Sequence, residues 1–250
     1  MFDPIPGFSI GDFGLYWQMI QAEFPECMAQ ETIDQAVETF VAESTVRFQL
    51  SPEPLLPRCV YRHGERGELI QVQSDRFSFN WIRQPGGVYP RYETTAQRLW
   101  QLFEGFASFL YARGLSAPML TQCEITNVNV LRLSQFGGDM AIALRAVGVQ
   151  ANAPADFGHL RIEGVQMFQH HVILDDNGAP IGRLHTQLQP VIDVESRESA
   201  LRYDLVARGA PFGSSRSGAE EFFECARSAV NALFLSTTTV EARASWGETS

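Results

Sequence analysis

The sequence contains no lysine: all 19 basic residues among its 250 are arginine. A Schiff-base lysine, a lysine general base and the phosphate-binding lysine of Walker-type loops each need an ammonium group. A guanidinium cannot replace it in any of these roles. These three chemistries are therefore excluded.

Common catalytic motifs are few. No HExxH or DxDxG pattern occurs, and the GxSxG match at 7–11, GFSIG, lies in the Pro/Gly-rich entry of the chain and not after a predicted strand. Neither Gly86-Gly87 nor Gly137-Gly138 lies in a GxGxxG context between a strand and a helix. A nucleotide-binding loop is therefore unsupported. We expect a protein that is not an enzyme and that has no cofactor and no metal.

Cysteines are few, and long apolar runs are absent. The four cysteines lie far apart without a CxxC pair, which is typical of buried free thiols in a reducing compartment and not of a zinc site or a disulfide framework. No apolar run reaches the roughly 18 residues of a membrane span, and the N-terminus lacks a basic region followed by an apolar one. We expect a cytoplasmic protein with no membrane partner. The cysteines are Cys27, Cys59, Cys123 and Cys225.

The sequence contains fewer basic residues (19) than acidic ones (29). The net charge is −10 and the pI is about 5.0, which disfavours DNA binding because phosphate neutralisation needs a clustered cationic surface. One local arginine cluster leaves RNA binding open. It comprises Arg58, Arg62, Arg66, Arg76, Arg83 and Arg91.

The first part of the chain mixes helix and loop signals. Apolar residues at three- and four-residue spacing predict a helix that opens at Gly11-Asp12 and ends before Pro25. A second helix is predicted over 31–42 and a short strand over 45–50. The proline-rich segment 51–57 is a predicted loop because proline removes backbone donors.

The stretch 71–114 gives the most consistent signals. Segments 58–63 and 68–73 form a predicted hairpin, and the apolar parity changes after it, which indicates a turn or bulge at Ser74-Asp75 before the next strand. A long amphipathic helix then follows from a capping box, Thr94 with Gln97, to Gly114. Its predicted buried stripe is Leu99, Leu102, Phe103, Phe106 and Leu110.

The rest of the chain predicts antiparallel strands and then a helix. The turn Asp176-Asn177-Gly178 favours a type I′ hairpin, in which both central residues have positive φ. Ser217 with Glu220 and Thr238 with Glu241 are predicted capping boxes of a long helix and of a short one ending at Trp246-Gly247. The predicted strands are 120–133, 139–149, 158–174, 181–194 and 199–208.

Together these elements predict an α+β fold in which antiparallel sheets pack on long amphipathic helices. Each half reads as a strand meander followed by a long helix, although no residue-level repeat is visible. We assign residues 1–116 and 117–250 to the two halves. A single compact domain remains the alternative.

Three ordered segments resemble an uncharacterised, sporadically distributed family of bacterial and archaeal proteins of about this length. They are QVQSDRFSFNW, YPRYE leading into the long helix, and LSTTTVEARASWG, with IGDF as weaker support. The resemblance implies a patchily inherited accessory protein and transfers no catalytic residue. Family members usually carry an extra apolar strand before the region that matches IPGFSIGDF, so we expect either a shortened start or an open sheet position.

The residues around the turn before the long helix combine aromatic, amide and guanidinium groups, which suits a partner-binding surface. Strand-end packing with a surface pair between Arg91 and Glu93 is the structural alternative. The candidate partner-binding residues are Asn80, Trp81, Arg83, Arg91, Tyr92 and Glu93.

The histidines offer a second, weaker candidate site. Adjacent residues of a strand point to opposite faces, so His170 and His171 cannot both bind one ion. Simple pairing around Asn177-Gly178 places His170 opposite His185. A packed or surface pair is favoured over a metal or acid-base role.

These observations favour a non-enzymatic accessory or regulatory subunit that binds another protein or forms a homo-oligomer, in a bacterial defence or toxin-antitoxin-like system. One alternative is a small-ligand or nucleotide module with a cavity lined by Phe77, Phe79, Trp81 and Phe106. Another is an RNA-binding protein that uses the arginine cluster.

Overall fold

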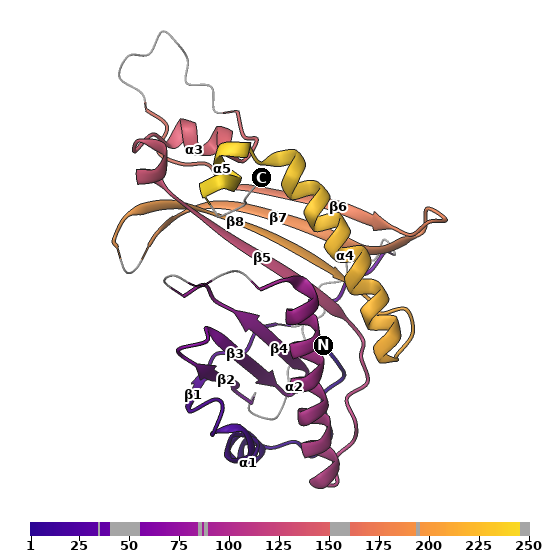
Figure 1. The fold of residues 1–250 in the computed structure, drawn as a ribbon. Helices are drawn as coiled ribbons and strands as arrows, with labels where there is room; N and C mark the ends of the chain where they lie inside the picture. The colour runs from indigo at the N-terminus through magenta and orange to yellow at the C-terminus, as the bar shows by residue number, and fades with distance from the viewer. Residues whose placement is uncertain are drawn as a thin grey trace. The chain divides into compact units, whose positions relative to one another are not determined.

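A computed structural model of the chain describes residues 1–34, 36–40, 56–84, 87, 90–150, 161–193 and 196–245. These residues form an α+β fold with five α-helices and two four-stranded antiparallel sheets (Figure 1). The chain divides into two compact units, Met1–Thr121 and Gln122–Ser250, called here the N-terminal and C-terminal units.

The sheet of the N-terminal unit is a simple antiparallel meander. Its strands are β1 (Glu26–Gln30), β2 (Arg58–His63), β3 (Glu68–Gln73) and β4 (Arg76–Trp81), in that spatial order. The predicted hairpin of residues 58–73 is confirmed. The chain turns at Ser74-Asp75, as the change of parity predicted.

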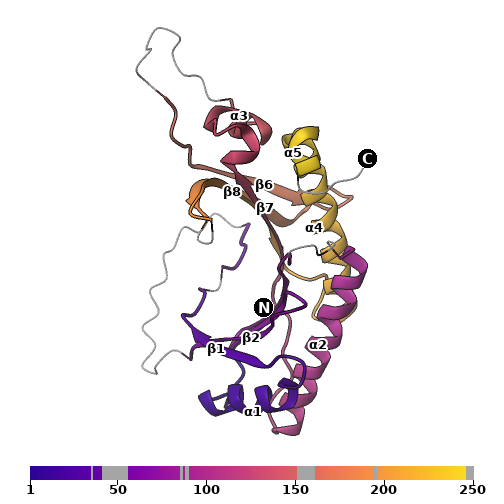
Figure 2. The same ribbon diagram turned by 60° about the vertical axis from the view of Figure 1, so that its left-hand side comes forward.

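Two helices cover one face of this sheet (Figure 2). They are α1 (Ile10–Ile20) and α2 (Tyr92–Ala112), which confirms two of the three helices predicted in this unit. Phe106 of α2 is fully buried, and its ring lies 5.4 Å from that of Phe77 on β4 and 5.3 Å from that of Tyr16 on α1. Aromatic side chains therefore form the centre of this core.

Two predictions in this unit are wrong, and one strand was missed. Residues 31–34 and 36–40 are not helical, because the Gln73 amide binds both the N–H of Ile33 (2.9 Å) and its carbonyl (3.1 Å). Strand β1 was not predicted. Helix α2 begins at Tyr92, before the predicted Thr94–Gln97 box, and its N-cap Arg91 makes no side-chain cap bond. The predicted strand 45–50 and most of the predicted loop 51–57 lie outside the described residues.

The sheet of the C-terminal unit has a different strand order. Its strands are β5 (Cys123–Arg132), β6 (Met167–Leu174), β7 (Pro180–Ile192) and β8 (Ser199–Gly209). The last three form a meander, and β5 pairs with β8, which gives the order β5-β8-β7-β6. The first strand of this unit therefore lies beside the last one.

The long helix α4 (Arg216–Thr237) packs on one face of this sheet, as Figure 1 shows, and the short helix α5 (Val240–Ser245) follows it. The buried Phe222 of α4 lies against two glycines that face each other on β7 and β8. A Cβ on Gly209 would lie 2.4 Å from the Phe222 ring, and one on Gly182 would lie 3.0 Å from it. The missing side chains therefore let the helix approach the sheet.

The predicted strand 139–149 is wrong. After a 3-10 turn, η1 (Leu133–Phe136), residues Met140–Ala146 form the helix α3. The Asp139 carboxylate accepts hydrogen bonds from the N–H groups of Ala141 (2.8 Å) and Ile142 (3.4 Å), and so caps the helix.

The other strands occur, but their details differ. Strand β6 begins at Met167; residues 161–166 are not a strand, and 158–160 lie outside the described residues. In the β6-β7 turn only Gly178 has a positive φ (79°), so the turn is not type I′. The Asp175 carboxylate instead accepts bonds from the N–H groups of Asn177 and Ala179, and the register shifts between Ile173 and Leu174.

The predicted helix caps are displaced. The N-cap of α4 is Ser215, whose hydroxyl accepts a bond from Gly218 N–H (3.2 Å), so the predicted box at Ser217 is wrong. Thr239, not Thr238, caps α5 by accepting from Ala242 N–H (3.3 Å). The predicted end at Trp246-Gly247 lies outside the described residues.

Candidate partner-binding site at the edge of β4

β4 is an edge strand, and its backbone polarity can be assigned. Ile82 N–H donates to Gly67 O (2.8 Å), which extends the register of β3 and β4 by one pair. Because bonded residues alternate in an antiparallel ladder, Asn80 and Ser78 bond to β3, whereas the N–H and C=O groups of Phe77 and Phe79 point away from it. Within the described ranges, no strand pairs with this outer edge.

The two faces of β4 differ in character. Phe77 and Phe79 face α2 and belong to its core, with the Phe77 ring 5.5 Å from that of Phe103. Ser78 and Asn80 lie on the other face. On that face two buried donors, Arg76 Nε and Asn80 Nδ2, have no acceptor among the described residues. Such donors are rare in folded proteins, because leaving one unpaired costs about 1–3 kcal/mol.

The predicted site residues flank the connection between β4 and α2. Asn80 and Trp81 end β4 and are half-buried, and the exposed Arg83 follows two residues later. Arg91, exposed, is the N-cap of α2, and Tyr92 and Glu93 form its first turn. The Arg91 carbonyl accepts a bond from the Thr95 hydroxyl (3.3 Å). The outward direction of the Phe77 and Phe79 amides was not predicted from the sequence. The alternation of residues along the β3-β4 hairpin is the signal that could have shown it.

An arginine-centred network fixes α2 beside the sheet. The Arg98 side chain, 17% exposed, forms ion pairs with Glu68 of β3 (3.1 Å) and with Glu23, and its guanidinium lies 5.9 Å from the centre of the Phe24 ring. Because these carboxylates come from two separate segments, the network ties three parts of the unit together. We assign it a structural role.

Three of the six arginines in the predicted cluster are engaged in contacts within the N-terminal unit. Arg66 pairs with Glu23 (3.1 Å), and Arg76 is buried and donates to the Asp34 carbonyl (3.2 Å). Arg58 donates to the Gln71 amide, to the Gln30 amide (2.7 Å) and to the Glu31 carbonyl (3.1 Å). The other three, Arg62, Arg83 and Arg91, are exposed, and RNA binding at this cluster stays a prediction.

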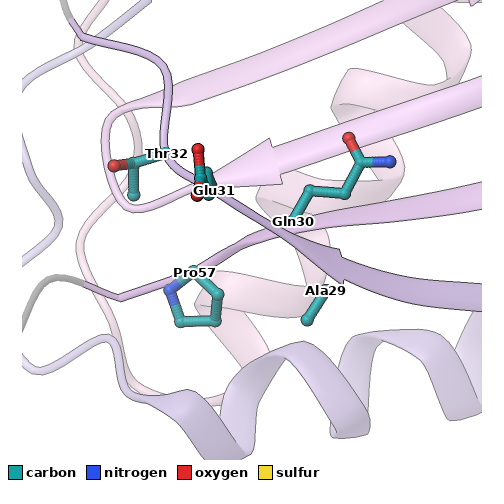
Figure 3. Close-up of a pocket in the computed structure, with 5 residues that line it drawn as sticks. All are labelled: Ala29, Gln30, Glu31, Thr32 and Pro57. Carbon is teal, nitrogen blue, oxygen red and sulfur yellow. The ribbon is translucent and has the colours of Figure 1, made fainter.

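Three of the four aromatic residues proposed to line a cavity, Phe77, Phe79 and Phe106, belong to one packed core. Phe77 and Phe106 are buried, with stacked rings 5.4 Å apart, and Phe79 packs on the same core. A hollow is instead found beside β1, lined by Ala29, Gln30, Glu31, Thr32 and Pro57 (Figure 3). Its strand is fully exposed, so the hollow is an open surface depression.

The histidine pair forms as predicted. His170 and His185 face each other, with 2.7 Å between their Nδ1 atoms and 4.8 Å between their ring centres. In the described part of the chain, no group of three or more His, Cys, Asp or Glu side chains is arranged to hold a metal ion.

All four cysteines are free thiols. Cys59 and Cys123 are buried, and burial raises the pKa of each thiol to about 11. Cys225 is half-buried, and Cys27 is exposed. Because the thiolate is the reactive form, the two buried cysteines are poor nucleophiles at neutral pH.

Comparison with known proteins adds no assignment: no family model, no curated protein and no solved structure matches the chain. Within the described ranges, no helix has the length and apolar character needed to cross a membrane.

Proposed function

We propose that this chain is a non-enzymatic accessory or regulatory subunit that binds another protein by accepting an extended segment of it at the outer edge of β4. In this mode of recognition, backbone hydrogen bonds supply affinity and alternating side chains supply specificity. A place in a defence or toxin-antitoxin-like system rests on the family resemblance alone.

The observation that carries the proposal is the difference between the two sheets. In the C-terminal unit, β5 precedes the helix α3 and pairs along its whole length with β8, the last strand of the meander. The N-terminal unit likewise has a helix, a meander and a long helix, but no described strand lies beside β4, its last strand. The position that β5 fills in one sheet is therefore open in the other.

The placement of α2 supports a strand at this position. Helix α2 packs chiefly on β4, the edge strand, whereas α4 packs on all four strands of its sheet. A strand added beyond β4 would place alternate side chains beneath α2, near the partly buried Leu99 and Phe103. The expected partner segment therefore has apolar residues at every second position.

The opposite face supplies a polar requirement. Arg76 Nε and Asn80 Nδ2 are donors on β4 without acceptors among the described residues. Carbonyl or carboxylate oxygens of an added strand would satisfy them. The expected segment therefore alternates apolar residues with acceptors such as Asp, Asn or Ser.

Hydrogen exchange tests the proposal at single residues. The protein would be purified from its native host with the partner that remains bound through gel filtration. The amides of Phe77 and Phe79 should exchange fast in the free protein and slowly in the complex, whereas those of Ser78 and Asn80 should be protected in both. Absence of a stoichiometric partner, or a partner that leaves Phe77 and Phe79 unprotected, would contradict the proposal.

A charge placed on the edge provides a second test. Ser78→Lys puts an ammonium in the middle of β4, the device by which natural edge strands avoid pairing. It should remove most of the bound partner. Met19→Lys, on the exposed side of α1 (57% exposed), is the matched control and should retain it.

A further inference from the structure

The outer edge of β6 is also unpaired. Asp193 N–H donates to Glu198 O (2.8 Å), one pair beyond the register of β7 and β8. Because hydrogen-bonded pairs alternate in an antiparallel ladder, the odd-numbered residues of β7 form the backbone hydrogen bonds to β8. The even residues of β7 therefore bond to the odd residues of β6. The N–H and C=O groups of Phe168, His170 and Val172 consequently point away from β7, and within the described ranges no strand meets them.

Apart from the register shift between Ile173 and Leu174 at its end, β6 has none of the features that usually protect an edge strand. Its sequence, MFQHHVIL, contains no charged residue, no proline and no glycine. Phe168 is 62% exposed and Val172 is 51% exposed. Natural proteins block such edges with charge, proline or bulges, so an edge with none of these from Met167 to Ile173 indicates a pairing surface.

The strand is self-complementary about His170. In antiparallel pairing of two copies centred on this residue, Phe168 of one copy lies opposite Val172 of the other, and on the second face Gln169 lies opposite His171. Met167 lies opposite Ile173. Apolar residues thus meet apolar ones and polar residues meet polar ones. A register centred on His171 instead places His170 opposite Val172 and Gln169 opposite Ile173.

We propose that a second copy of this chain pairs with β6 in antiparallel register centred on His170, forming a homodimer. The backbone fits this register, because the outward-pointing residues 168, 170 and 172 of one copy face residues 172, 170 and 168 of the other. Each of these pairs exchanges two hydrogen bonds. The contact is isologous, so it closes after two copies.

Charge explains why this edge, of all surfaces, suits a second copy. Each chain carries a net charge of −10, so most surfaces of two copies repel each other. The pairing segment itself is free of charge. The remaining repulsion is screened over about 8 Å at physiological ionic strength, so the dimer should strengthen with added salt.

Sedimentation velocity of the full chain over a range of concentrations tests dimer formation. Val172→Lys places an ammonium on the pairing edge and should weaken the dimer at least about tenfold, which corresponds to about 1.4 kcal/mol. Leu235→Lys on α4 is the matched control, since Leu235 is 52% exposed and Val172 is 51% exposed. It should dimerise like the parent protein.

Cysteine cross-linking tests the register. In a Cys27→Ser background, His170→Cys places two thiols opposite each other, with Cα atoms about 5.5 Å apart, within disulfide range. His171→Cys leaves the two Cα atoms on a diagonal of about 7–8 Å, too far for an unstrained bridge. Oxidised glutathione should therefore link the first variant and not the second.

Several results would overturn the proposal. They are a monomer at every concentration, equal dimerisation of Val172→Lys and Leu235→Lys, or preferential cross-linking through position 171. Binding of an unrelated protein to β6 in place of a second copy would also contradict it. Ser78→Lys should leave the dimer intact, so failure at β4 and failure at β6 are distinguishable.

Discussion

His170 and His185 face each other across β6 and β7, with their Nδ1 atoms 2.7 Å apart. At this distance one ring must donate and the other must accept. When both rings are protonated, all four ring nitrogens are donors and the bond cannot form. The contact therefore requires the two rings to take opposite hydrogen-bonding roles.

Asp12 should make the N-terminal unit sensitive to acid. Its buried carboxylate accepts bonds from Ser9 N–H (2.9 Å), the Ser9 hydroxyl (2.7 Å) and Arg113 Nε (2.9 Å). Burial alone would raise the pKa of Asp12, but the bonds from Ser9 and Arg113 outweigh burial and hold the pKa below its ordinary value. A lowered folded-state pKa stabilises the fold above the unfolded-state pKa, and this contribution is lost as pH falls through the folded-state pKa.

Asp12→Asn should accordingly cost more stability at pH 7 than in acid. At pH 7 we expect a loss of about 1–3 kcal/mol, because donors of Ser9 and Arg113 lose a charged acceptor. Near pH 3 the difference between variant and parent should shrink. Urea unfolding at both pH values measures this, and a loss that is independent of pH would contradict the assigned role of the carboxylate.

The strands of the N-terminal hairpin could be predicted because their signal is local. Residues 58–63 and 68–73 are rich in β-branched and apolar residues around a polar turn, and the change of parity marks Ser74-Asp75 as the next turn. The strand β1 could not be predicted in the same way. Its sequence, ECMAQ, is exposed at every position and has no apolar alternation, so it becomes a strand only through pairing with β2.

Side-chain contacts distant in sequence explain the other misses. Residues 31–40 have helical apolar spacing, but the amide of Gln73 binds the backbone of Ile33, and residues 31–34 and 36–40 are not helical. In residues 139–149 the single Asp139 cap and the buried spacing Met140, Ala143, Leu144 decide for a helix. Alternating apolar residues in a short segment fit either structure.

The candidate site was predictable in composition but not in geometry. Asn80 and Trp81 stand out by residue type, and both lie on β4. Whether a strand has one neighbour or two depends on pairing between distant segments, which periodicity does not encode. The open edges of β4 and β6 therefore emerged only from the sheet order.

The N-cap of α4 can be tested by a pair of serine substitutions. Ser215 accepts from Gly218 N–H (3.2 Å) and lies just before the helix, whereas Ser217 lies inside it. Ser215→Ala should destabilise the protein by about 1 kcal/mol. Ser217→Ala should change stability by less than about 0.5 kcal/mol. A larger loss of stability for Ser217→Ala than for Ser215→Ala in urea unfolding would instead support the predicted capping box at Ser217.

Two glycine-to-alanine substitutions should act in opposite directions. On β8, a Cβ at Gly209 would lie 2.4 Å from the Phe222 ring and 2.3 Å from the Ile181 carbonyl oxygen, so Gly209→Ala must displace α4 or the β7 backbone. We expect a loss of about 1–3 kcal/mol, as for other overpacked cores.

On α2, a Cβ at Gly105 meets no atom within 4 Å. Gly105→Ala should therefore stabilise the helix by about 0.5–1 kcal/mol, because alanine loses less backbone entropy. Thermal unfolding measures both shifts, and a neutral Gly209→Ala would show that Phe222 is not seated on the glycine pair.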